Sequence, residues 1–244
     1  MWNNLLDNFL SQSSFVTSEA ENCVYVKVNS DNSKLILISW VDVIIIAGSN
    51  LKVVEDVKSA LTKNFKTKDF GIFSELIGMQ FVFDKNEVKI HQSKYAEKVL
   101  TRFNMTDCNV KSLPCDPSFV KIYLADYKTF YDNKLYRQIL GSLVYLMSCT
   151  RPDLCCIVAK LSENLDKPTV AHYNACKHVL RYLKNTIHMD LIYFKCDATI
   201  NLTGWCDVDW DSSSCRKSLS GCCFQIYSEN SYVSWKTKTH PTVA

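Results

Sequence analysis

Two apolar runs that flank a single aspartate constrain the fold of this chain more than any other feature. Residues 35–40 read LILISW and residues 43–48 read VIIIAG, with Val41 and Asp42 between them. Runs of this length, rich in β-branched side chains, predict two strands buried on both faces. Because only two residues separate the runs, we expect a hairpin with Asp42 at its tip.

Asp42 is the first candidate functional residue. A carboxylate within a run of isoleucines is costly unless it is exposed at a turn, paired with a cation or bound to a metal ion. An exposed turn acid with no catalytic role is the alternative, and the residues alone leave both interpretations open.

Composition excludes several classes of protein. The 47% apolar and 22% charged residues are typical of a globular chain rather than a disordered one. The net charge is only +3, so any surface that binds nucleic acid must be local. Among the six glycines, the closest pair, Gly71 and Gly78, is too widely spaced for the common glycine-rich nucleotide loops.

The cysteines and the N-terminal residues indicate an intracellular protein, either cytoplasmic or nuclear. None of the 12 cysteines has C-x-x-C spacing, so we expect reduced and mostly buried thiols. Residues 1–14 lack the basic start of a signal peptide. The most apolar segment, residues 35–47, contains Asp42 and is too short to span a bilayer.

Apolar periodicity predicts an α/β (α+β) chain in which two β-rich parts are joined by helices. Strands are expected near 23–28, 35–40, 43–48, 72–92 and after 188, and helices over 51–65, 93–103 and within 136–186. Residues 106–130 are irregular and resemble a linker. Helix caps are predicted at Ser49 or Asn50, Ser93, Thr150 and Thr169.

Two acids near the C-terminus form a second candidate site. Asp207 and Asp209 are two residues apart on a predicted strand, so both carboxylates face the same side. With Asp211 as a third ligand they are suited to Mg²⁺. The alternative is a strand end whose acids are simply solvated.

Two further groups of residues are weaker candidates. His172 and Cys176 share a helix face near His178, but zinc requires four ligands and no second pair is evident. Lys94, Lys98 and Arg102 recur at i, i+4 spacing, so their helix face can follow phosphates or can be an ordinary solvated face.

Seven sequence blocks, spread along nearly the whole chain, together resemble those of a known family. They read LISWVDVIIIAGSN at 37–50, FKTKDFG at 65–71, ELIGMQF at 75–81, HQSKYAEKVLTRFNM at 91–105, YRQILGSLVYLMSCTRPDL at 136–154, AHYNACKHVLRYLKNT at 171–186 and LTGWCDVDW at 202–210. This order resembles the reverse transcriptase and RNase H region of copia-type retrotransposon polyproteins.

The resemblance implies four parts and a function. It implies a partial reverse-transcriptase palm at 1–92, a thumb-like helix and linker at 93–130, a helical connection at 131–190 and an incomplete RNase H-like sheet at 191–244. The implied activity is RNA-directed DNA synthesis with RNase H cleavage, using Mg²⁺ on a primer-template or an RNA–DNA hybrid.

The same resemblance assigns roles to individual residues. Asp42 and Asp207 match the catalytic, metal-binding acids of the two ancestral centres. Lys94, Lys98 and Arg102 match the thumb surface that contacts nucleic acid.

Departures from the family pattern predict that this chain is inactive for both reactions. Val43 stands where the polymerase motif has a second acid. The resemblance begins downstream of the palm motif that supplies another aspartate, and residues 240–244 fall where the helix with the next RNase H glutamate is expected to begin. Two-metal chemistry needs several such acids.

Two alternatives remain open from the sequence. The first is a non-catalytic protein that binds nucleic acid or another partner through the same scaffold. The second is a chain that does not fold stably, because a partial RNase H sheet leaves edge strands and apolar surface uncovered.

Overall fold

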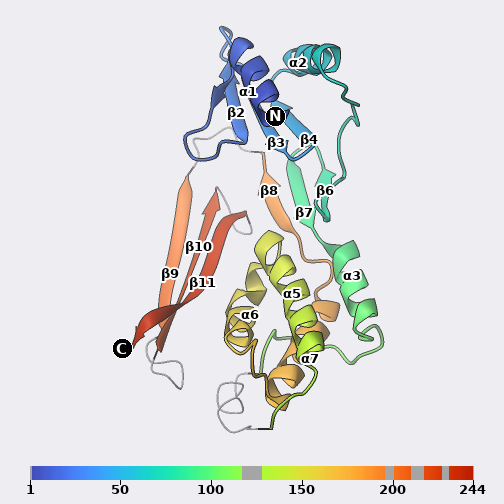
Figure 1. Cartoon of the computed structure of the whole chain (residues 1–244), viewed down its shortest axis with the longest axis vertical. Coiled ribbons are helices and arrows are strands. Elements are labelled where there is room, and N and C mark those ends of the chain that lie inside the picture. Colours follow the sequence, from blue (N-terminus) through green and yellow to red (C-terminus); the bar gives the residue numbers. More distant parts are fainter. Residues whose placement is uncertain (1, 117–127, 196–200, 210–216, 227–230, 244) are drawn as a thin grey trace. The chain divides into compact units, whose positions relative to one another are not determined.

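The chain, drawn in Figure 1, folds into two compact units, Met1–Ile72 and Phe73–Ala244. Each unit has its own apolar core. The computed structural model describes residues 2–116, 128–195, 201–209, 217–226 and 231–243. Both units combine helices with antiparallel sheets, as the α+β prediction required.

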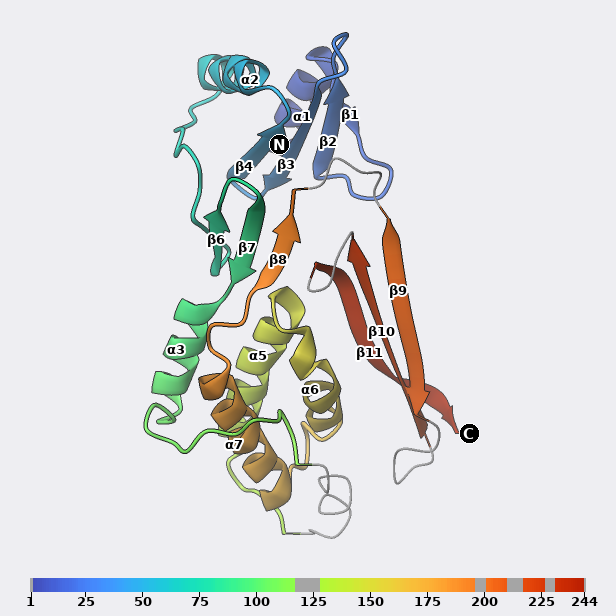
Figure 2. The ribbon, with the colours of Figure 1, turned by 180° about the vertical axis from the view of Figure 1, so that it is seen from behind.

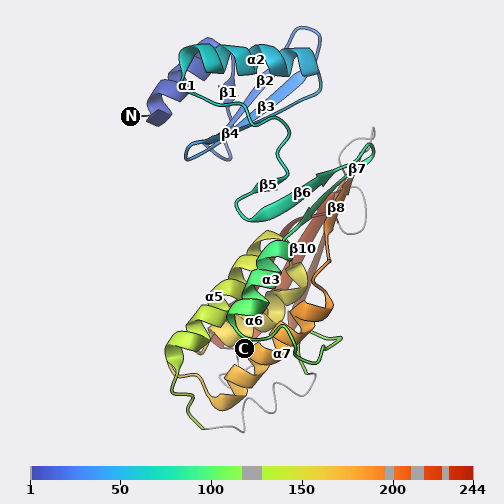
Figure 3. The ribbon, with the colours of Figure 1, turned by 90° about the vertical axis from the view of Figure 1, so that its right-hand side faces the viewer.

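The first unit is an antiparallel sheet covered on one face by two helices (Figure 3). Asn50 begins the second helix by accepting a hydrogen bond from the Lys52 N–H at 3.0 Å, which confirms one of the two predicted caps. The elements are α1 (Trp2–Gln12), β1 (Val16–Thr17), β2 (Val24–Val28), β3 (Lys34–Trp40), β4 (Val43–Gly48) and α2 (Leu51–Asn64).

Strand β3 is buried on one face only, so the prediction of burial on both faces was wrong. Leu35 and Leu37 contact the helices, whereas Ile36, Ile38 and Trp40 alternate with them and are exposed, Trp40 by 55%. Helices α1 and α2 both pack on the face of β3 from which Leu35 and Leu37 project. An unbroken apolar run therefore does not reveal which of its faces is covered.

The second unit contains a group of helices and two antiparallel sheets. The helices are α3 (Ser93–Arg102), α5 (Asn133–Cys149), the short 3₁₀ helix η1 (Pro152–Leu154), α6 (Cys155–Ser162) and α7 (Val170–Asn185). One sheet has the order β5-β6-β7-β8 and the other β11-β10-β9. Their strands are β5 (Glu75–Leu76), β6 (Met79–Phe83), β7 (Glu87–His91), β8 (Leu191–Phe194), β9 (Leu202–Asp209), β10 (Lys217–Ile226) and β11 (Tyr232–Val243).

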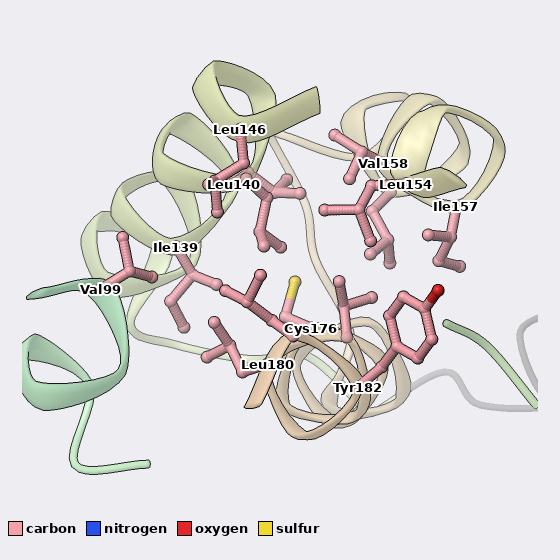
Figure 4. Close-up of a cluster of buried hydrophobic side chains, with 14 of the residues drawn as sticks. Val99, Ile139, Leu140, Leu146, Leu154, Ile157, Val158, Cys176, Leu180 and Tyr182 are labelled. Carbon is pink, nitrogen blue, oxygen red and sulfur yellow. The ribbon is translucent and has the colours of Figure 1, made fainter. Parts of the chain in front are cut away.

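The core of the second unit is formed where α3, α5, α6 and α7 meet (Figure 4). Apolar residues three and four apart on α5 make one continuous buried stripe, as predicted from their periodicity. The side chains that fill this core include Val99, Ile139, Leu140, Leu143, Leu146, Val158, Cys176 and Leu180.

The helix starts agree with the sequence at one of the remaining three predicted caps. Thr169 caps α7, accepting from the His172 N–H, and His172 completes a capping box. Ser93 is instead the first residue of α3 and its hydroxyl donates to the Ile187 carbonyl at 2.9 Å. Thr150 ends α5, and its hydroxyl donates to the Gln92 side chain at 2.9 Å. The predictions of caps at Ser93 and Thr150 were therefore wrong, because both hydroxyls bond residues that are distant in sequence.

Truncation within the helical core tests this packing. Leu143→Ala, at a fully buried position, is expected to lower the free energy of unfolding by about 2–5 kcal/mol because it leaves a cavity. Val144→Ala is the matched control one residue along, at a position 37% exposed, and is expected to cost less than about 1 kcal/mol. Urea unfolding followed by helical circular dichroism measures both, and equal losses would contradict the assigned core.

Candidate functional site

Asp42 lies in an exposed two-residue turn at the tip of the β3–β4 hairpin, as predicted. Trp40 and Val43 are the last paired residues of the two strands, so Val41 and Asp42 form the turn. Val41 has a positive φ of 55°, a left-handed conformation that β-branched residues rarely adopt. The turn therefore presents the Asp42 carboxylate to solvent rather than burying it.

The described residues around Asp42 do not fit a two-metal centre. Asp42 forms no ion pair with another described residue. No group of three His, Cys, Asp or Glu side chains suited to one metal ion occurs in the described part of the chain. Mg²⁺ is commonly held by one or two carboxylates plus substrate phosphates, so Asp42 alone supplies one of several ligands that two ions require.

Asp207 lies on β9, directly opposite Gly221 of β10. Its carboxylate accepts a hydrogen bond from the Val208 N–H at 3.0 Å and is exposed. Asp211 and the side chain of Asp209 lie outside the described residues. Asp207 and Asp42 belong to different units of the chain.

The three predicted basic residues all lie on the exposed side of α3, but they are not equivalent. The Lys94 ammonium is 2.9 Å from the Glu75 carboxylate. This hydrogen-bonded contact, with a smaller contribution from Lys98, lowers the pKa of the Glu75 carboxyl. Lys98 and Arg102 form no ion pair with another described residue, so they carry the unneutralised charge of this face.

His172 and Cys176 do not form a metal site. The His172 ring accepts the Thr169 N–H at 2.9 Å within the helix cap. Cys176 is fully buried in the helical core, and this burial raises the pKa of its thiol to about 12. Both residues stabilise α7, one at its N-terminus and the other on its buried face.

The sequence analysis missed a buried arginine that joins two helices. Two N–H groups of the Arg151 guanidinium donate to the two carboxylate oxygens of Asp153 at 2.9 and 2.7 Å. Others donate to the Thr186 carbonyl at 3.1 Å and hydroxyl at 2.6 Å, and the guanidinium lies over the Tyr182 ring. Arg151 thereby fixes the start of η1 against the end of α7.

The sequence held only part of the signal for this network. Arg151 and Asp153 are separated by one proline, a spacing that allows the planar guanidinium to bind one carboxylate through two bonds. Thr186 and Tyr182 are more than 30 residues away, so the sequence does not show that they complete the site.

Comparison with known proteins identifies the family. Residues 1–117 match the family described as "Reverse transcriptase (RNA-dependent DNA polymerase)". The whole chain is 32% identical to the retrovirus-related Pol polyprotein from transposon TNT 1-94 of Nicotiana tabacum. It is also 32% identical to the uncharacterized mitochondrial protein AtMg00810 of Arabidopsis thaliana, with 85% of each chain covered. The chain belongs to the Pol polyprotein family of copia-type retrotransposons.

This retrotransposon Pol chain matches only part of the polyproteins. It covers 19% of the TNT 1-94 polyprotein and 16% of the Pol polyprotein from transposon RE1 of Arabidopsis thaliana, to which it is 29% identical. Reverse transcriptases bind nucleic acid templates and generally use divalent metal ions. No solved structure matches the chain. None of the described helices is long and apolar enough to cross a membrane.

The Lys94–Glu75 pair gives a pH-dependent prediction. Lys94→Met is expected to raise the pKa of Glu75 toward its ordinary value of 4.5, and Lys98→Met to raise it less. Because the folded-state pKa is depressed, the contribution of Glu75 to stability is present above its unfolded pKa and is lost as the pH falls through the folded one. Carboxyl NMR titration measures the shift, and an unchanged Glu75 pKa in Lys94→Met would rule out this pairing.

The buried arginine gives a stability prediction with a matched control. The Arg151 side chain is only 4% exposed. Arg151→Met is expected to lower the free energy of unfolding by about 3–5 kcal/mol, because Asp153 and Thr186 lose their hydrogen-bond donor. Arg137→Met breaks a pair with Asp166 in which the arginine is 53% exposed, and is expected to cost less than about 1 kcal/mol. Chemical denaturation measures both losses, and a smaller loss at Arg151 than at Arg137 refutes the structural role.

Proposed function

We propose that this chain provides the palm hairpin, thumb, helical connection and first RNase H strands of a reverse transcriptase. In this proposal the chain binds nucleic acid but does not by itself catalyse DNA synthesis. The corresponding segments are 1–92, 93–130, 131–190 and 191–244. The order of elements supports this division, since a helix-backed sheet precedes a hairpin, a basic helix, the helical core and an antiparallel sheet.

The hairpin that carries Asp42 is the observation on which the proposal rests. An exposed acid at the tip of two paired apolar strands, in a sheet backed by helices, is the arrangement expected of the polymerase acid in this family. Within the proposal Asp42 is the remaining metal-binding acid of the palm, and Asp207 is its counterpart in the RNase H part.

Polymerisation by this chain alone is not part of the proposal. Val43, the position of the second acid, is an apolar residue that cannot bind Mg²⁺. Each carboxylate lost from a two-metal centre weakens the hold on ions that stabilise the attacking and leaving oxygens. We therefore assign the chain a binding role for primer-template or RNA–DNA hybrid.

The basic side of α3 is the proposed binding surface. Lys98 and Arg102 are exposed and lie one helical turn apart, a spacing suited to successive phosphates. Strand β7 ends at His91 and α3 begins at Ser93, so a single residue joins the β6–β7 hairpin to the basic helix. The aromatic rings of Phe81 and Phe83 on β6 cluster with that of Phe73, which precedes β5, and the ring centroids are 4.9 to 6.3 Å apart.

A salt titration tests the proposed binding. The chain is expected to bind a labelled RNA–DNA hybrid, and the logarithm of the binding constant is expected to fall linearly with the logarithm of the salt concentration, because phosphate contacts release counterions. Replacing Lys98 and Arg102 together by Ala is expected to reduce the steepness of that slope by about 1–2. Fluorescence anisotropy at several salt concentrations measures it.

Lys134→Ala is the control for this titration, since Lys134 is also an exposed lysine of the second unit but lies on α5. It is expected to leave the slope unchanged. Absence of binding at low salt, binding indifferent to salt, or an equal effect of the control would each contradict the proposal.

A further inference from the structure

A pocket of about 650 Å³ lies within the second unit, between the η1–α6 segment and the β9–β10–β11 sheet. Figure 2 shows α6 beside β11, the strand of this sheet that it contacts. Of the residues given a role in the proposed function, Asp207 lines this pocket, and the proposal assigns no role to the other residues that line it. Its walls combine aromatic rings with carboxylates, which is an unusual lining for a packing defect.

Two tryptophans, Trp205 and Trp235, flank Cys223 in this sheet. Cys223 of β10 is paired with Trp205 of β9 on one side and with Trp235 of β11 on the other. Directly paired residues project from the same face of a sheet, so all three face the pocket that they line. The row is therefore indole, thiol, indole.

The floor of the pocket beside this row is open. Gly221 is two residues from Cys223 on the same face, and no atom lies within 4 Å of the position that a β-carbon would take there. At Gly204, in the same sheet, such a carbon would be 2.7 Å from the Phe224 ring. The space above Gly221 is thus a feature of the pocket and not of the sheet in general.

A β-bulge brings a third aromatic ring to the same face. The register of β10 with β11 passes from Phe224 opposite Ser234 to Gln225 opposite Tyr232, so Val233 is the extra residue. Without the bulge, Tyr232 would lie on the face opposite to Trp235. With it, Tyr232 and Trp235 both line the pocket.

One wall is fixed and the other is accessible. The Trp235 indole donates to the Met147 carbonyl at 2.7 Å, which holds its ring against α5. Trp205 is 52% exposed on the outer strand of the sheet, where a ligand can reach it.

The charges around the pocket favour a cation. Asp190 and Asp207 line it, whereas the Arg151 guanidinium is already bonded to Asp153. Lys236 also lines the pocket, but it is paired with Cys222 and so projects from the opposite face to Trp235. Lys89, which is near Asp190, has Glu87 as its main partner.

We infer that this pocket binds a trimethylammonium group. Strands are about 4.8 Å apart, so the backbones at Trp205 and Trp235, two strands apart, are separated by about 9.6 Å. A group midway between indole rings that project at this spacing lies about 5 Å from each ring. This is within the range of about 6 Å over which aromatic rings attract organic cations. A single nucleobase would have to be about 3.5 Å from both rings to stack between them, and the carboxylates disfavour its phosphates.

The test follows the indole N–H resonances of the full chain by NMR during addition of choline, with assignments from Trp→Phe variants. Choline is expected to shift the Trp205 and Trp235 resonances and to leave those of Trp2 and Trp40, in the first unit, unchanged. The uncharged isostere 3,3-dimethylbutanol is expected to bind about tenfold more weakly, because it lacks the cation–π and carboxylate attraction.

Two variants locate the site. Gly221→Leu places a side chain in the open space without moving the aromatic walls, and is expected to abolish the shifts. Its backbone lies outside the left-handed region, so it accepts a side chain. Ser234→Leu adds the same bulk next to Trp235 on the opposite face and is expected to leave choline binding intact.

A second comparison distinguishes the sources of the group. A peptide containing trimethyllysine that binds more tightly than choline, with unmodified lysine peptide weaker, indicates a modified protein as ligand, whereas equal affinities indicate a free small molecule. Equal shifts with 3,3-dimethylbutanol, shifts with adenosine but not choline, or unchanged binding in Gly221→Leu would each overturn the inference.

Discussion

Burial of the apolar stripe of α5 against α3, α6 and α7 is the interaction on which the second unit depends. Leu140, Leu143 and Leu146 are almost completely inaccessible, and the stripe contacts each neighbouring helix. Arg151 then fixes the register between η1 and α7 with bonds that no apolar contact could specify. The flanking sheets are attached to this core, β8 through the end of α7 and β11 through Trp235 and α6.

The first unit shows how an apolar hairpin can present a polar group. Strands β3 and β4 are paired as far as Trp40 and Val43, so only Val41 and Asp42 are left to form the turn. So tight a turn is made with a left-handed backbone conformation at Val41. That constraint leaves the Asp42 carboxylate in water, where it needs no compensating cation. The same geometry allows a carboxylate to meet a metal ion, but one acid is insufficient for the two-metal chemistry of polymerases.

Local patterns predicted the parts that depend on local physics. The hairpin, the position of Asp42, the Asn50 and Thr169 caps and the α5 stripe all follow from spacing that neighbouring residues decide. Ser93 and Thr150 were assigned wrongly as caps because their hydroxyls bond Ile187 and Gln92, which are distant in sequence. The tryptophan row was equally hidden, because it requires the register of three strands and a bulge at Val233.

Primer extension on a primed RNA template, with Mg²⁺ or Mn²⁺, decides whether the acids retained in this chain suffice for synthesis. The chain as it stands is expected to bind the primed template and to elongate no primer above the protein-free background, and Asp42→Asn is expected to behave identically. Elongation by the unaltered chain that Asp42→Asn abolishes would show a working catalytic centre and would contradict the binding role assigned here.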